Sequence, residues 1–362
     1  MYLSELRIQN LRSLGDVVLT PTSGWNAFVG PNGAGKTSVL EAVFLLSHGR
    51  SFRRGARESL SSIGSTGFSV FGSVSCGNGR ERRLGLSRAG GKLESRVDGE
   101  ATGLSGLVEA CAVVCFEPGS HELINGAAEE RRRYLDWGVF HVEHAFLEHW
   151  RRYQRALRQR NSALRNGADV ASLEPWEIEM AESGHALTQM RKTYFEHLRP
   201  VLDAVLGEFL TELGAPAMAF DQGWKEGSEL LETWAESRQR DRERGHTGRG
   251  PHRADWSIGF EAAPRKEHLS RGQEKLCALA LVLAQARLHA ELSGEWPMVC
   301  LDDLGSELDL NHQARVIELI HASGAQVLVT GTDLPAGVRD LPGGCRVFHV
   351  EQGRVVGEPS SD

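Results

Sequence analysis

Residues 30–37 read Gly30-Pro31-Asn32-Gly33-Ala34-Gly35-Lys36-Thr37 and fill every position of the phosphate-binding pattern G-x-x-x-x-G-K-[ST]. The apolar run at 25–29 predicts a strand ahead of this loop, and residues 38–46 predict a helix behind it. Without these flanks, the stretch could be a glycine-rich turn that precedes a helix by chance. With them, it predicts a site for a nucleotide triphosphate.

The chemistry of this loop follows from its residue types. Its glycines let the backbone curl so that N–H groups point at the phosphates, and the helix N-terminus adds a partial positive charge. Lys36 is expected to contact the β- and γ-phosphates and to act in catalysis, and the Thr37 hydroxyl is expected to bind Mg²⁺. The residues predicted to bind the nucleotide in this loop are Gly30, Pro31, Asn32, Gly33, Ala34, Gly35, Lys36, Thr37 and Ser38.

A second group of motifs lies far along the chain. Ser270 is placed to cap a long apolar-rich helix at 274–292, and the buried-strand run 296–301 ends in two acids, Asp302 and Asp303. An acid at a strand end is suited to hold Mg²⁺, and a second acid beside it to orient the attacking water. Another helix (311–322) and another apolar strand (326–330) follow.

In this order and spacing, the motifs resemble the head domain of ABC-type ATPases, with Walker A, signature, Walker B, D-loop and switch strand. Within that superfamily, the chain resembles the RecF family of bacterial recombination mediators nearly end to end. The resemblance is carried by YLSELRIQNLR at 2–12, RRRYLD at 131–136, GPHR at 250–253, and DD at 302–303 leading into SELD at 306–309. It implies a signature of Ser270, Arg271, Gly272 and Gln273, a D-loop with Ser306 and Asp309, a switch residue Thr330, Mg²⁺ ligands Thr37 and Asp302, and a catalytic Asp303.

The resemblance also implies a mechanism. In such heads the signature contacts ATP on the P-loop of the opposite subunit, so the protein is expected to act as an ATP-gated homodimer. Asp303 is one methylene shorter than the glutamate of transporters, and the uncharged Thr330 stands where transporters often have histidine. No clear Q-loop glutamine occurs near 115–118. These departures predict slow hydrolysis, as in a switch. Arg12 resembles an N-terminal arginine that reaches the nucleotide phosphates; a surface arginine is the alternative.

Arginine clusters bear on DNA binding. The net charge is -7, which is unusual for a DNA-binding protein, but arginines are concentrated at 131–165 and just after the P-loop helix. Such clusters predict sequence-independent contacts with the phosphate backbone, although a solvated helix face is the alternative for each of them. The arginines predicted to contact DNA are Arg50, Arg53, Arg54, Arg131, Arg132, Arg133, Arg151, Arg152, Arg155 and Arg158.

Composition and resemblance together set the expected environment and partners. Hydrophobic content of 40% and charged content of 25% are ordinary for a soluble globular protein. We expect no membrane span, and the six scattered cysteines fit a reducing cytoplasm. Cys111 and Cys115 lie in an apolar strand, so we expect them to be small buried residues and not metal ligands. The resemblance implies ATP and Mg²⁺ as ligands, and as partners double-stranded DNA, gap junctions, RecR and, indirectly, RecA.

The predicted fold is α/β, with a P-loop core, antiparallel strands and an inserted helical arm. Strands at 68–74, 83–86 and 112–116 predict the antiparallel portion beside the P-loop unit. We expect one half of the head at 1–125, an arm at 126–247 that is basic in its first part, and the other half at 248–362.

Within the arm, helical spacing covers 147–164, Pro175 is expected to break the pattern, and helices are predicted at 176–213, kinked at Pro200, and at 229–244. This arm is shorter than the coiled coils of SMC-type relatives. Two other functions stay open. The basic segment at 131–165 argues against a nucleotide-binding subunit of a transporter, and Asp302-Asp303 argues against a scaffold that does not hydrolyse ATP.

Overall fold

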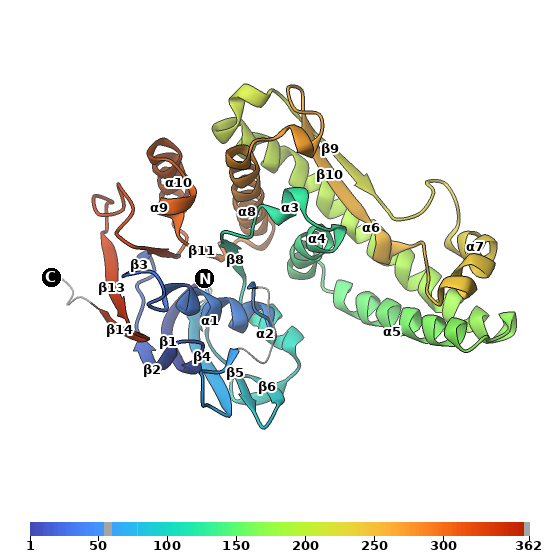
Figure 1. The fold of residues 1–362 in the computed structure, drawn as a ribbon, viewed down its shortest axis with the longest axis horizontal. Coiled ribbons are helices and arrows are strands. Elements are labelled where there is room, and N and C mark those ends of the chain that lie inside the picture. Colours follow the sequence, from blue (N-terminus) through green and yellow to red (C-terminus); the bar gives the residue numbers. More distant parts are fainter. Residues whose placement is uncertain (54–59, 78, 358–362) are drawn as a thin grey trace. The chain divides into compact units, whose positions relative to one another are not determined.

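The computed structural model describes residues 1–53, 60–77 and 79–357. The chain forms two compact units, residues 1–120 with 278–362 and residues 121–277, which we call the head unit and the arm unit (Figure 1). The helix α8 (Arg271–Ser293) begins in the arm unit and continues into the head unit. Arg54, one of the arginines predicted to contact DNA, lies outside the described residues.

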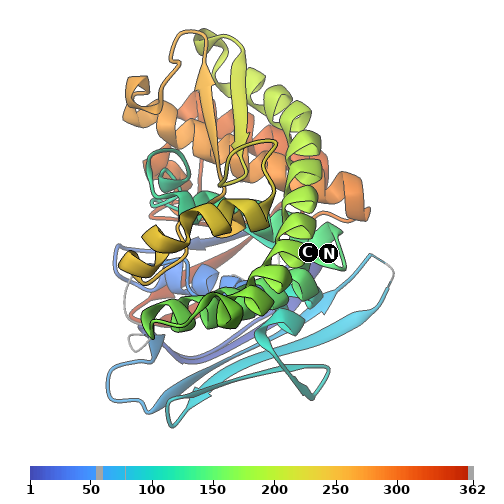
Figure 2. The same ribbon diagram turned by 90° about the vertical axis from the view of Figure 1, so that its right-hand side faces the viewer.

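The head unit contains two six-stranded sheets. The antiparallel sheet has the order β2-β1-β4-β5-β6-β7, and its long strands lie side by side in Figure 2. Its members are β1 (Tyr2–Leu11), β2 (Leu14–Leu19), β4 (Gly67–Ser75), β5 (Glu81–Ala89), β6 (Lys92–Val97) and β7 (Glu100–Thr102).

The second sheet has the order β14-β13-β3-β12-β11-β8 and is parallel except at β14. Its strands are β3 (Trp25–Val29), β8 (Val113–Phe116), β11 (Met298–Leu301), β12 (Val327–Gly331), β13 (Cys345–Glu351) and β14 (Arg354–Gly357). The strand predicted at 112–116 therefore belongs here and not with the antiparallel strands, because β8 pairs with β11 in parallel register.

Helix α1 (Lys36–His48) joins the two sheets through one hydrophobic core. Val39, Leu40 and Val43 are buried in a cluster that includes Ile8 of the antiparallel sheet and Leu328 of the parallel sheet. Burying an aliphatic side chain of this size contributes about 1.5–3 kcal/mol, so this packing fixes the start of α1. The remaining helices of the head unit are α2 (Leu104–Ala110), α9 (Leu304–Glu307) and α10 (Leu310–Ser323).

In the arm unit, α5 (Phe146–Arg165) and α6 (Val170–Phe209) lie side by side (Figure 1). Pro175 does not break the helix as expected. It lies inside the 40-residue α6, as does Pro200. Each proline removes one backbone hydrogen bond of the helix, while the buried face of α6 continues past both positions. The other elements are α3 (Glu122–Asn125), α4 (Ala128–Val142), β9 (Pro216–Asp221), α7 (Leu230–Arg244), β10 (Asp255–Phe260) and 3-10 turns at Thr211–Leu213, Pro251–Arg253 and Lys266–His268.

The unit boundaries differ from the expected ones. Residues 248–277 were expected in the head but belong to the arm unit, because β10 pairs with β9 in antiparallel register across the intervening helix α7. By length and composition alone, the 23-residue helix α8 could cross a membrane, since an 18-residue window within it has a mean hydropathy of 1.3. However, 72% of that window is buried, as in the core helix of a globular protein.

Candidate nucleotide site

The phosphate-binding loop lies at the carboxyl edge of the parallel sheet. It follows β3, which has β12 and β13 as neighbours, and it leads directly into α1. Gly30 has φ 157°, and a Cβ there would lie 2.2 Å from the carbonyl oxygen of Val350. Gly35 has φ 116°, and a Cβ there would lie 3.0 Å from Ser13 Oγ and 2.9 Å from Leu14 Cδ2. The loop therefore depends on both glycines, and it is packed against the turn between β1 and β2.

The ammonium group of Lys36 is folded over the loop that precedes it. Its Nζ donates to the carbonyl oxygens of Gly30 at 2.8 Å and Pro31 at 3.0 Å, and the residue is only 8% exposed. The N-terminus of α1, which begins at Lys36, adds its partial positive charge at the same place. Together these donors form an environment that favours a bound anion.

Asp302 joins the P-loop helix to two strand ends. Its Oδ1 accepts hydrogen bonds from the hydroxyl of Thr37 at 2.9 Å and from the hydroxyl of Thr330 at 2.7 Å. The Thr330 oxygen in turn accepts the N–H of Asp303 at 2.8 Å. Asp302 is 3% exposed, and burial raises its pKa although both hydroxyl bonds oppose that change. The predicted Walker A, Walker B and switch residues thus meet at one point.

This donor set fits Mg²⁺. A hydroxyl and a carboxylate are hard oxygen ligands of the kind that Mg²⁺ prefers, and Mg²⁺ usually binds to one or two protein groups plus phosphates and water. Thr37 Oγ1 and Asp302 Oδ1 already lie within hydrogen-bond distance of each other. A buried carboxylate with a raised pKa gains most from a nearby cation.

Asp303 and the D-loop follow β11 closely. Asp303 has the left-handed φ of 55° and precedes α9 as its N-cap residue. Ser306 is exposed, and Asp309 caps α10 by accepting the N–H groups of Asn311 and His312, each at 3.0 Å. Hydrogen bonds from His312 lower the pKa of Asp309. The carboxylate of Asp309 therefore already has partners within its own chain.

The signature segment lies in the arm unit, where it starts α8. The Ser270 hydroxyl accepts the N–H of Gln273 at 3.3 Å, while the Gln273 side chain accepts the N–H of Ser270 at 3.0 Å. This reciprocal arrangement is a capping box, so the predicted cap at Ser270 is confirmed. Ser270, Arg271 and Gly272 are exposed.

Arg12 contacts a residue that sequence reasoning missed. Its Nε and Nη2 donate to the two carboxylate oxygens of Glu41, at 3.0 and 2.7 Å, and Glu41 is completely buried in α1. The available signal was a single acid within the apolar helix predicted at 38–46, because buried carboxylates need a charged or hydrogen-bonding partner. Arg53, predicted to contact DNA, also faces this carboxylate at 3.9 Å.

Several arginines of the basic segment are structural. Arg131 is nearly buried and pairs with both carboxylate oxygens of Asp255 on β10, so it does not offer its charge to DNA. The half-buried Arg132 donates to the carbonyl oxygen of Ala254 at 2.7 Å. Arg152 forms two bonds to Glu179 on α6, at 2.7 and 3.0 Å.

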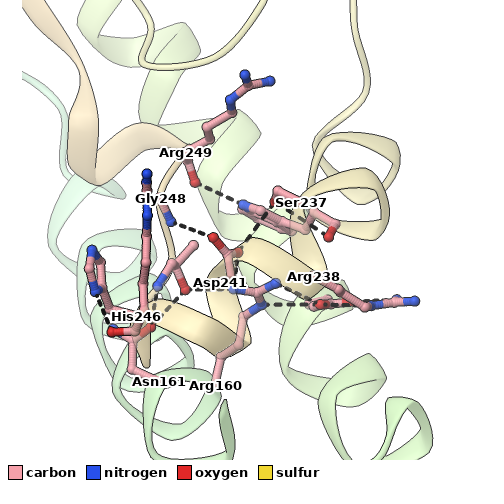
Figure 3. Close-up of polar contacts among 12 residues, drawn as sticks. Arg160, Asn161, Ser237, Arg238, Asp241, His246, Gly248 and Arg249 are labelled. Atoms are coloured by element: carbon pink, nitrogen blue, oxygen red, sulfur yellow. Dashed lines mark hydrogen bonds and ion pairs between the residues drawn. The ribbon is translucent and has the colours of Figure 1, made fainter. Parts of the chain in front are cut away.

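Arg160, from the same basic segment, is fully buried in the centre of the arm unit. It donates to Asp241 at 2.9 Å and to Thr247 at 2.7 Å, and it pairs with Glu177 at 3.0 Å (Figure 3). Arg238 binds the other oxygen of Glu177 at 2.6 Å. The network ties α5, α6 and α7 together.

The remaining predicted DNA contacts lie nearer the surface. Arg50 is partly exposed, and Arg133 is exposed but pairs with Glu129 and Glu130 one turn earlier on α4. Arg151, Arg155 and Arg158 are exposed on α5. Their i, i+4, i+7 spacing puts them on one face of that helix. We call these three residues the α5 arginine stripe.

The segment GPHR at 250–253 has a structural role in the arm unit. His252 Nδ1 lies 2.7 Å from the hydroxyl of Tyr153, and its Nε2 lies 3.0 Å from the carbonyl oxygen of Thr247. Burial lowers the pKa of His252 to about 4. The carbonyl of Pro251 accepts a bond from Arg191 at 2.7 Å. This segment therefore joins α5 and α6 to the loop before β10.

Comparisons with known proteins find relatives that match nearly the whole chain. Residues 2–336 match the family model described as RecF/RecN/SMC N terminal domain. The DNA replication and repair protein RecF of Xanthomonas euvesicatoria pv. vesicatoria is 48% identical over 361 residues, covering 98% of both chains. The RecF protein of Stenotrophomonas maltophilia is 45% identical, covering 99% of this chain and all of the relative. The chain belongs to the RecF family.

Solved structures support the same assignment. The recombination mediator protein RecF with ATP, from the RecFOR pathway, has a TM-score of 0.88 at 28% identity and covers 99% of this chain and 98% of its own. An Smc head domain from Pyrococcus furiosus has a TM-score of 0.60 at 16% identity, which shows the shared fold alone. Membership in the RecF family and the ABC-type ATPase head, both expected from sequence, are confirmed.

Proposed function

We propose that this RecF-family protein binds ATP and Mg²⁺ at its P-loop and hydrolyses ATP slowly, as a conformational switch in recombinational DNA repair. The observation that carries the proposal is the junction at Asp302, where the Thr37 hydroxyl and the Thr330 hydroxyl meet the Walker B carboxylate. A related RecF structure contains ATP, which supports the same ligand here.

The residues of the chain divide the chemistry among them. The loop N–H groups and Lys36 hold the phosphates, and the Lys36 ammonium exchanges its two carbonyl partners for phosphate oxygens. Thr37 and Asp302 would hold Mg²⁺, which would neutralise charge on the β- and γ-phosphates. Asp303 would orient the attacking water. The hydroxyl of Thr330 holds the backbone of Asp303 in place.

Slow turnover follows from the same residues. The short side chain of Asp303 reaches less far than a glutamate would, and Thr330 brings no positive charge to the transition state. Preorganised charge is usually the largest contribution to catalysis, so its absence favours a long-lived ATP state. An ATP state that persists is suited to a clamp on DNA.

We further propose that ATP joins two copies of the chain. The signature segment at 270–273, whose first three residues are exposed, begins a 23-residue helix, so its N-terminus is suited to bind the γ-phosphate of ATP held by a second copy. The exposed D-loop residue Ser306 would lie at the same interface. Contacts present only in the closed dimer would be lost after hydrolysis, and the two copies would separate.

Double-stranded DNA is the proposed partner of the arm unit. The α5 arginine stripe spans about 10 Å along the helix axis, from the rise of 1.5 Å per residue. Arg155 keeps 65% of its side chain exposed, and its Nη2 lies 4.0 Å from the carboxylate of Glu179. Such charges fit phosphate contacts that do not depend on sequence. Through gap junctions and RecR, the DNA-bound dimer would then help to load RecA in the cytoplasm.

Measuring the size of the protein in solution tests the ATP-dependent dimer. The native chain should dimerise with ATP, and Lys36→Met should abolish ATP binding and dimerisation together. Ser270→Arg should keep ATP binding to the monomer while blocking the dimer. Loss of ATP binding in Ser270→Arg would refute the assignment of the signature to the partner's nucleotide.

The α5 arginine stripe is tested by the salt dependence of DNA binding. Replacing Arg155 and Arg158 with glutamine should weaken binding to all duplexes alike. The slope of the logarithm of the binding constant against the logarithm of the salt concentration should become smaller in magnitude by about two, because each lost phosphate contact contributes about 0.9. Arg133→Gln, whose charge is already paired on α4, serves as the matched control. An unchanged slope in the double variant would place the DNA elsewhere.

A further inference from the structure

The segment 245–253, which lies between α7 and β10, presents two arginines to solvent. Arg249 and Arg253 are exposed, and neither is among the arginines predicted from sequence to contact DNA. Within the residues that the structure describes, neither guanidinium has a hydrogen bond or an ion pair. Figure 3 shows the guanidinium of Arg249 pointing away from the polar contacts around Asp241. We call residues 245–253 the arginine loop.

Buried groups of the arm unit fix the backbone around Arg249. Its carbonyl oxygen accepts the indole N–H of the completely buried Trp234 at 2.8 Å. The N–H of the preceding residue, Gly248, donates to the carboxylate of Asp241 at 3.0 Å. Asp241 is 1% exposed and also binds Arg160, at 2.9 Å. Any movement of this backbone would leave a buried polar group without its partner, which is costly.

The backbone that carries Arg253 is fixed as well. Its N–H donates to the carbonyl oxygen of Gly250 at 2.8 Å, within the 3-10 turn Pro251–Arg253. The N–H of Gly250 donates to the carbonyl oxygen of Gly223 at 3.0 Å, and a Cβ at Gly250 would lie 3.0 Å from the hydroxyl of Tyr153. Both arginines therefore extend from a backbone whose conformation is set before a ligand binds, so binding does not have to order the loop.

The arginine loop borders the side of α5 that carries Arg158. Thr247 donates its N–H and its hydroxyl to the side-chain oxygen of Asn161, at 2.8 and 2.7 Å. Asn161 lies three residues after Arg158 on α5, so the two side chains lie on one side of the helix. A Cβ at Gly245 would also lie 3.0 Å from Arg165 Cγ, near the end of α5. The loop and the α5 arginine stripe are therefore neighbouring elements of one unit.

We propose that Arg249 and Arg253 of the arginine loop are a second element that contacts the phosphate backbone of duplex DNA. The proposal rests on the proposed binding of DNA to the arm unit and adds a site from a different part of the chain. Guanidinium groups without an acid partner contribute their whole charge to phosphate contacts. Arginines on two neighbouring elements suit a polyanion whose charges repeat along a line. Asn161 and Asp241 are then positioning residues, because they hold the loop backbone.

The salt dependence of duplex binding by the full-length protein tests the two arginines. Affinity would be measured with ATP and Mg²⁺ for two labelled duplexes of unrelated sequence. In the double variant Arg249→Gln with Arg253→Gln, the slope of the logarithm of the binding constant against the logarithm of the salt concentration should become smaller in magnitude by about two for both duplexes. The corresponding double lysine variant keeps both charges and should keep the slope. Arg199→Gln is the matched control, because Arg199 is exposed on α6 but paired with Glu196 at 3.1 Å.

The positioning role has a different signature. Asn161→Ala removes the acceptor of both bonds from Thr247, so the loop should become less ordered while its charges remain. Duplex affinity should then fall about 3- to 10-fold with an unchanged salt slope, because a loop that must be ordered on binding costs affinity. A melting curve shows whether Asn161→Ala is folded at the assay temperature. If it does not fold, the arginine variants decide the question, since their side chains are exposed.

Failure of the arginine loop differs from failure of the proposed DNA contact of the arm unit. An unchanged slope in the Arg249 and Arg253 variant, with a reduced slope in the Arg155 and Arg158 variant, would overturn the loop alone. Unchanged slopes in both variants would overturn the DNA contact of the arm unit. Weaker binding to only one of the two duplexes would contradict contacts that are independent of sequence. Native affinity in a folded Asn161→Ala variant would overturn the positioning role.

Discussion

Replacing Arg160 with leucine should unfold the arm unit at much lower temperature than the native chain. Arg160 is completely buried, and its partners Glu177 and Asp241 are each only 1% exposed. The substitution leaves both carboxylates in a buried environment, where one of them keeps Arg238 and the other keeps only hydrogen-bond donors such as Ser237. The cost is therefore the burial of charge without its partner.

The magnitude follows from that imbalance. Removing one partner of a buried ion pair costs about 3–5 kcal/mol. For a protein unit of 150–250 residues, each kcal/mol shifts the melting temperature by about 2–4 °C, so the expected decrease is about 6–20 °C. Replacing Asp241 with asparagine in the same chain should recover part of this loss, because it removes one unpaired charge.

Thermal unfolding followed by tryptophan fluorescence measures the effect. Trp234 is suited as a reporter, since its ring lies 5.9 Å from the guanidinium carbon of Arg160. Arg152→Leu is the matched control, because Arg152 lies on the same helix and also binds two carboxylates but is partly exposed to solvent. Equal destabilisation by the two substitutions would refute the argument that burial of the Arg160 network makes the difference.

Two further predictions concern the nucleotide site and the arm unit. Thr330→Val removes the hydroxyl that bonds to both Asp302 and Asp303, so the catalytic groups should be displaced and ATP turnover should fall about tenfold or more. Thr330→Ser keeps the hydroxyl and should keep the turnover. Equal turnover in the two variants would contradict this role of Thr330. His252 is held neutral with a pKa of about 4, below the ordinary 6.5, so its contribution to stability is complete above pH 6.5 and is lost as the pH falls toward 4. His252→Gln should therefore reduce the dependence of the free energy of unfolding on pH between pH 4 and 6.5. An unchanged slope of that free energy against pH would exclude His252 as the source of the dependence.

Local patterns in the sequence predicted the elements of the nucleotide site well. The strand at 25–29, the loop at 30–37 and the cap at Ser270 each depend on neighbouring residues, so propensity and spacing were enough to find them. Pairing between distant segments was not visible in the same way. The place of β10 beside β9 depends on a contact across α7, and this moved 248–277 into the arm unit.

The distribution of charge along the chain was the least reliable guide to which arginines stay exposed, for a physical reason. Arg131, Arg160 and Arg158 look alike in the basic segment, but their environments depend on acids elsewhere in the sequence. Arg131 is neutralised by Asp255 and Arg160 by Glu177 and Asp241, whereas Arg158 stays exposed on α5.

The same reasoning applies to Arg53, which a count of charge assigns to DNA although its guanidinium lies 3.9 Å from the buried carboxylate of Glu41 in α1. An arginine is available to a ligand only to the extent that its own chain has not already paired it. In this protein the acids that decide the matter are mostly buried, because burial makes an unpaired carboxylate costly and so requires an arginine beside it. The positive charge that stays exposed is therefore smaller than the sequence indicates, and within the segment 131–165 it includes Arg151, Arg155 and Arg158 of α5.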